Sequence, residues 1–140
     1  MRIWKLALLA LSLSIPCLLY GGSVQAQTIQ VTVRDLALKS GESTEVGDVY
    51  YISHDCKSLL KATPAVEIMD GPPGVTATIN PADVVPRAYS CAKPVKGGKL
   101  VITAKDIQDH SYTRMVLRIN MQTLNGDRQF SRNFNVTLFP

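Results

Sequence analysis

Residues 113–138 read TRMVLRINMQTLNGDRQFSRNFNVTL. Polar and apolar side chains alternate on both sides of Asn125-Gly126, and this period of two is typical of strands that bury one face. Asn-Gly is the strongest short signal for a hairpin, because both residues tolerate positive φ. The stretch therefore predicts two antiparallel strands, 113–123 and 128–138, with Asn125 and Gly126 as the two turn residues.

The position of the turn also predicts which residues face each other. With the Asn-Gly pair at the turn, Leu117 lies opposite Phe134 and apolar side chains of both strands meet on one face. A slip of one residue would place apolar side chains of one strand against polar side chains of the other. Only Ile119, opposite Arg132, departs from this agreement, and we expect the arginine to lie near the sheet margin.

The rest of the chain reads as shorter strands. Alternation and β-branched or aromatic residues predict further strands at 28–33, 47–53, 66–68, 75–79 and 99–104. Residues that favour turns separate them, at 39–42, 70–74, 80–81 and 96–98. In the first strand, Ile29, Val31 and Val33 are expected to face the core.

Helical signals are few. Residues 56–62 contain good helix formers after Asp55, a possible cap, and Pro64 limits this segment to about two turns. Residues 81–85 predict at most one further helical turn. The chain is therefore expected to be almost entirely β-structure.

The N-terminal residues have the layout of an export signal. Arg2 and Lys5 precede an apolar run at 6–20, and small residues lead to Ala26. The apolar run is shorter than the roughly 20 residues that a spanning helix needs. We expect residues 1–26 to be a signal peptide removed after Ala26, which predicts a periplasmic or secreted protein without stable membrane insertion.

Three cysteines are present, and the predicted cleavage removes one of them, Cys17. Lipidation at Cys17 stays open as an alternative, although Pro16 stands where a small residue normally precedes a lipidated cysteine. The remaining pair, Cys56 and Cys91, predicts a disulfide in an oxidising compartment. A loop of this length gives roughly 3–4 kcal/mol in the chain-entropy model. Free thiols, or half of a metal site, are the alternative.

Charge argues against a nucleic-acid partner. Without Arg2 and Lys5, thirteen Lys and Arg residues stand against eleven Asp and Glu residues. These cations are spread singly along the chain, whereas nucleic-acid binding needs them clustered on one element.

Residues 27–140 are long enough for one domain. About seven short strands and a terminal hairpin in such a length resemble the small sandwich domains of the immunoglobulin and fibronectin type III kind. The resemblance implies an all-β fold, an immunoglobulin-like antiparallel β-sandwich whose last two strands are the hairpin. Two features depart from it: the only tryptophan is Trp4, in the predicted signal peptide, and Cys91 lies in a proline-rich connection at 86–94.

Two clusters contain groups that could carry chemistry. His54, Asp55 and Cys56 can each bind a metal or activate a nucleophile, but neighbouring strand residues point to opposite faces and a disulfide offers no thiolate. The second cluster, in an expected loop, consists of Asp106, Asp109 and His110. It lacks the regular ligand spacing of a calcium loop, so solvated turn residues are the simpler interpretation.

No hydrolase motif and no phosphate-binding glycine loop is present in the sequence. We therefore expect no catalytic, cofactor-binding or metal-binding residues, and a non-enzymatic binding or accessory protein whose partner is a protein or a cell-envelope component. Tyrosines could form its recognition surface, namely Tyr50, Tyr51, Tyr89 and Tyr112. A pilus-type subunit is one alternative. The other is an inhibitor of an exported hydrolase that presents the rigid loop 70–74.

Overall fold

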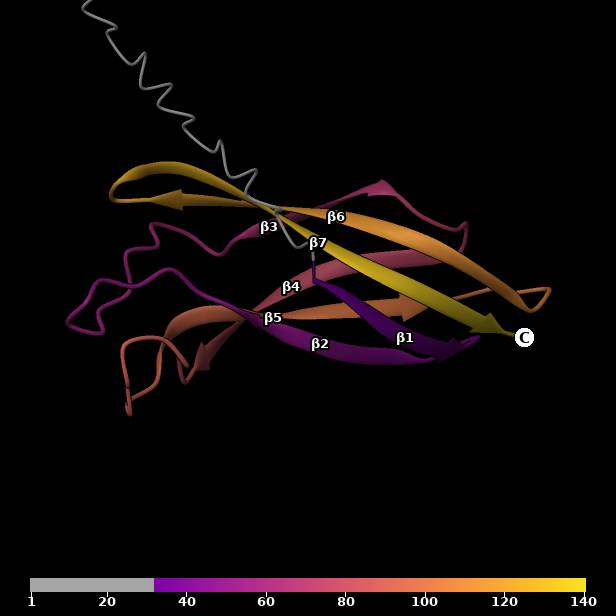
Figure 1. Ribbon diagram of the computed structural model, residues 1–140, viewed down its shortest axis with the longest axis horizontal. Helices are drawn as coiled ribbons and strands as arrows, with labels where there is room; N and C mark the ends of the chain where they lie inside the picture. Colours follow the sequence, from indigo (N-terminus) through magenta and orange to yellow (C-terminus); the bar gives the residue numbers. More distant parts are fainter. Residues whose placement is uncertain (1–31) are drawn as a thin grey trace, which may run out of the picture.

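The structure is a computed structural model, and it describes residues 32–140. Within this part, seven strands form two facing sheets and no helix is present (Figure 1). The strands are β1 (Val33–Lys39), β2 (Ser43–Val49), β3 (Ala65–Asp70), β4 (Val75–Val84), β5 (Val95–Ala104), β6 (Ser111–Thr123) and β7 (Gly126–Phe139). The predicted all-β fold of about seven strands is confirmed.

One sheet has the order β1-β7-β6-β3 and the other the order β2-β5-β4. All pairings are antiparallel except that of β1 with β7, which is parallel and corrects the expectation of a purely antiparallel fold. The connection between β1 and β2 crosses from one sheet to the other. Its Ser40 N–H bonds Phe139 O of β7 at 2.9 Å, and its Gly41 N–H bonds Ala104 O of β5 at 2.8 Å.

The terminal hairpin forms as predicted, but its register differs by two residues. Thr123 pairs with Gly126, so Leu117 lies opposite Arg132 and Met115 lies opposite Phe134. Gly126 has a φ of +93° and continues into β7, so the turn residues are Leu124 and Asn125. The Thr123 hydroxyl donates to Gly126 O and accepts from the Asn125 N–H, at 2.6 and 3.1 Å, which closes the turn.

A shift of two residues is one full pleat, so every side chain stays on its predicted face. Ile119 lies opposite Phe130, and not opposite Arg132. The apolar side chains on one face of β6, and most of those of β7, meet the inner face of the second sheet. The most deeply buried members of this core include Leu38, Ile102, Met115, Leu117, Ile119, Phe134, Val136 and Leu138.

Several predicted boundaries are wrong. The strand expected at 47–53 is β2, which begins at Ser43 and ends at Val49. The turn expected at 80–81 lies inside β4, where Pro81 is tolerated because β4 is an edge strand that pairs only with β5. The turn expected at 96–98 lies inside β5. A side chain at Gly97 would collide with Val49 O of β2, so this glycine allows two strands to approach closely.

The two predicted helical segments are also absent. Residues 81–85 mostly continue β4, and residues 56–62 form a loop without helix. Cys56 has a φ of +64°, which is incompatible with a right-handed helix at this position. The loop is closed instead by backbone hydrogen bonds, such as the one that the Leu59 N–H donates to Tyr51 O at 2.8 Å.

Three predictions lie outside the described residues: the signal peptide at 1–26, Cys17, and most of the strand expected at 28–33. The one residue of that strand within a described element is Val33, which begins β1. Val33 is 40% exposed, so its predicted inward orientation is wrong.

Candidate functional site

The predicted disulfide is present, and it joins two loops at one end of the sandwich. Cys56 lies in the loop between β2 and β3, and Cys91 lies in the loop between β4 and β5, with 5.7 Å between the Cα atoms. Both loops emerge at the end where the β6–β7 hairpin turns (Figure 1). Cys56 has no thiolate to offer as ligand or nucleophile.

The other two members of the His54-Asp55-Cys56 triplet hold the loop together. The His54 ring lies 4.3 Å from the Tyr89 ring, across the disulfide-linked loops. Asp55 accepts a hydrogen bond from the Ser53 hydroxyl and pairs with Lys57 at 3.5 Å. The Ser53 hydroxyl is the main cause that lowers the pKa of Asp55. These contacts give the triplet a structural role.

The second predicted cluster does not form a ligand set. Asp106 has a φ of +55° in the turn after β5, and the His110 ring lies 5.0 Å from the Phe139 ring. In residues 32–140, no three His, Cys, Asp or Glu side chains come close enough together to hold a metal ion.

The four tyrosines that were expected to form a recognition surface differ in exposure: Tyr50 and Tyr51 are half-buried, whereas Tyr89 and Tyr112 are exposed.

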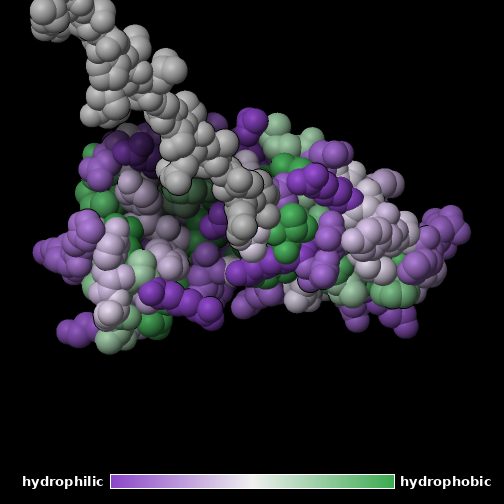
Figure 2. All heavy atoms as spheres, in the orientation of Figure 1, coloured by the Kyte–Doolittle hydropathy of each residue, from purple (hydrophilic) through white to green (hydrophobic). Residues whose placement is uncertain are grey.

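A groove of about 870 Å³ lies between the two sheets, and we call it the β7 groove. Its floor is the core itself, where Val49, Leu100, Ile119 and Phe134 are buried. On the face drawn in Figure 2, hydrophobic residues lie between hydrophilic ones. The groove opens on this side because β1 pairs with β7 only from Asn133 onward.

One wall of the groove is β2, which contains a β-bulge. Glu45 pairs with Val101 and Gly47 pairs with Leu100, so Val46 has no partner on β5. A bulged residue leaves the ladder and exposes its backbone groups. The Val46 carbonyl accepts a hydrogen bond of 2.9 Å from Arg34 Nη1, which holds the Arg34 guanidinium at the groove.

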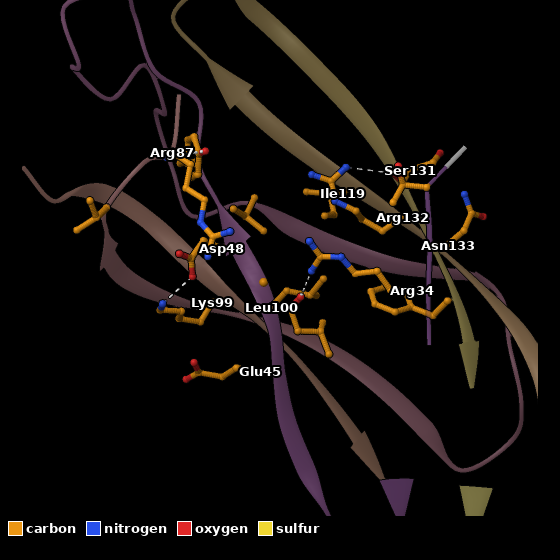
Figure 3. A pocket seen from close by; sticks show the side chains of 17 residues that line it. Arg34, Glu45, Asp48, Arg87, Lys99, Leu100, Ile119, Ser131, Arg132 and Asn133 are labelled. Atoms are coloured by element: carbon orange, nitrogen blue, oxygen red, sulfur yellow. Dashed lines mark hydrogen bonds and ion pairs between the residues drawn. The ribbon is translucent and has the colours of Figure 1, made fainter. Parts of the chain in front are cut away.

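Two further arginines reach the groove from other elements. Arg132 projects from β7, and Arg87 projects from the loop after β4. The backbone N–H of Arg87 donates a hydrogen bond to the Tyr50 hydroxyl at 3.2 Å. In the close-up, the guanidinium groups of Arg34 and Arg132 point into the space between β2 and β7, whereas the Arg87 side chain extends toward β2, near Asp48 in this view (Figure 3). A guanidinium has five N–H donors in a planar fork that matches a carboxylate or a phosphate.

Few acidic groups balance these cations. Asp48 is already paired with Lys99 at 2.6 Å, and this hydrogen bond raises the pKa of Lys99. Glu45 is the other carboxylate of the lining. None of the three arginines forms an ion pair with a carboxylate of residues 32–140. The lining therefore carries two more positive than negative charges.

The sequence did not predict that these three arginines lie together, because they are spread singly over about 100 positions. Only the parallel pairing of β1 with β7 and the path of the β4–β5 loop bring them together. The loop 70–74, a candidate for an inhibitory contact, connects β3 to β4 as predicted. It is exposed except for Pro72, which is half-buried.

No helix long and apolar enough to cross a membrane occurs in the described part of the chain. The sequence matches no protein-family model, and no curated protein gives a match.

Proposed function

We propose that the protein is an exported, non-enzymatic binding or accessory protein that takes an anionic partner in the β7 groove. Export rests on the predicted signal peptide at 1–26 and agrees with the Cys56–Cys91 disulfide, since disulfides persist in oxidising compartments. The partner is a protein or another component of the cell envelope.

One observation carries the proposal: Arg34, Arg87 and Arg132 line one groove, and none of them forms an ion pair with a carboxylate of the described residues. Cations that surround a cleft raise the local concentration of anions. The apolar floor below them is suited to hold an aliphatic part of the same partner, because such pockets combine apolar lining with a few polar groups.

The test uses protein purified from cells that express the full chain, so that export and processing take place. Polyglutamate is the probe, and calorimetry measures its affinity for the wild type and for Arg34→Gln with Arg132→Gln. We expect the affinity of the double variant to be at least about tenfold lower than that of the wild type, since each 1.4 kcal/mol of binding free energy lost is a factor of ten. The wild-type affinity should also fall as salt is raised.

Arg114→Gln is the matched control, because Arg114 is an exposed arginine of β6 that does not line the groove. Its affinity should equal that of the wild type. Equal affinity of the double variant and the wild type would contradict the proposal. N-terminal sequencing of the same preparation checks export, and the expected first residue is Gln27.

A further inference from the structure

The first half of β7 is a strand edge. Residues 126–132 pair with β6 on one side, from Thr123–Gly126 to Leu117–Arg132. On the other side, the pairing with β1 begins only at Asn133, and no other strand of residues 32–140 lies there. Each of these seven residues is exposed. A row of backbone N–H and C=O groups therefore faces the β7 groove, and such a row is a template for another strand.

The side chains beside this edge select the kind of strand. The side chains of Phe130 and Arg132 lie on the same face of β7 as that of Phe134, because successive side chains of a strand alternate between its two faces. Arg34 and Arg87 add their charges across the groove. An extended segment places every second side chain about 7 Å apart on one face. Carboxylates at these alternate positions would meet the guanidinium groups, with which they form strong charge-assisted hydrogen bonds.

Residues 27–32 read QTIQVT and carry no charge, so neither this segment nor its copy in a second molecule would neutralise the arginines. A polysaccharide or a phosphate would satisfy the arginines but would leave the strand edge without backbone partners.

We infer that the β7 groove takes an extended acidic segment of a partner protein, which adds as a strand to residues 126–132 of β7. This inference rests on the proposed function and specifies its partner. Backbone hydrogen bonds to β7 provide the pairing, and alternate Asp or Glu side chains of the partner contact Arg34, Arg87 and Arg132. This is strand addition to an exposed edge, in which side-chain pockets give the specificity.

The test uses the processed protein and an acetylated, amidated peptide of sequence TETETET. Nuclear magnetic resonance measures the hydrogen exchange of backbone amides in residues 126–132. We expect every second amide of this segment to exchange at least about tenfold more slowly with the peptide bound. A peptide N-methylated along its pairing edge keeps the charges but loses the backbone donors, and it should bind about tenfold more weakly. A TKTKTKT peptide should not bind.

The outcomes separate this inference from the proposed function. Equal binding of the N-methylated peptide, or tighter binding of polygalacturonate, would overturn strand addition and leave an anion-binding groove. Absence of binding by every anionic probe would overturn both. Amides of residues 126–132 that are already protected in the free protein would show that the edge is occupied without a partner, by the preceding residues or by a second copy, and would also overturn strand addition.

Discussion

The two halves of β7 belong to one continuous strand and have different surroundings. Residues 133–139 lie between β1 and β6, and Phe134 is 2% exposed. Residues 126–132 have only β6 as a described neighbour, and Phe130, on the same face, is 37% exposed. The comparison teaches that alternation fixes the face of a side chain, whereas the neighbouring strands fix how deeply that face is buried.

The largest effect is expected from the two phenylalanines. Phe134→Ala removes a buried ring and should lower the free energy of unfolding by about 3–5 kcal/mol. Phe130→Ala removes a partly exposed ring and should cost about 1 kcal/mol. Urea denaturation of both variants measures the difference. Equal losses would mean that the first half of β7 is covered in solution and would break the comparison.

The disulfide should have a slightly smaller effect. It joins the two loops that begin near the groove, after Tyr50 and after Val85. Replacing both Cys56 and Cys91 by serine should lower the free energy of unfolding by roughly 3–4 kcal/mol, because the unfolded chain regains the freedom of a 35-residue loop. In thermal unfolding, adding reductant should lower the midpoint of the wild type to that of the variant. The variant itself, as control, should not respond to reductant, and an unchanged wild-type midpoint would contradict the disulfide's contribution.

The smallest effect is expected from the ion pair on the wall opposite β7. The Asp48 carboxylate raises the pKa of Lys99 above its ordinary value of 10.5. A raised pKa in the folded state stabilises the protein at lower pH, and this contribution is lost as pH rises through the folded pKa. Lys99→Met should therefore melt slightly below the wild type at neutral pH, and the difference should be small because solvent reaches and screens the pair. The two melting temperatures should converge as the pH rises above 10.5 and Lys99 loses its proton. A gap of constant size across the pH range would exclude this ionic origin.

The hairpin shows how far sequence reasoning reaches. Alternation in β6 and β7 correctly predicted which residues face the core, and it stayed correct although the register was wrong by two residues. The Asn-Gly signal located the turn within one position. The signal fits two kinds of turn: one in which Asn125 and Gly126 both have positive φ, and the observed one, in which only Gly126 does. It could not distinguish them, because both need a glycine at position 126.

Errors concentrate where contacts across the fold override a local signal. Gly97 and Pro81 read as turn residues, yet Gly97 is required by the close approach of Val49, and Pro81 is permitted by its edge position. The helix formers at 56–62 form a loop because the disulfide and the bonds around Cys56 fix a different backbone. In each case the local preference amounts to about 1 kcal/mol, which tertiary packing exceeds.

The sequence by itself determined the all-β class, the number of strands, the hairpin with its two faces, and the cysteine pair, because alternation, turn chemistry and cysteine count are local or countable properties. Only the tertiary structure decided that β1 joins β7 in parallel, that the first half of β7 remains an edge, and that Arg34, Arg87 and Arg132 share a groove. The physical reason is that a strand carries no local record of which strand will lie beside it. Pairing partners are selected by how the two sheets together bury their apolar faces.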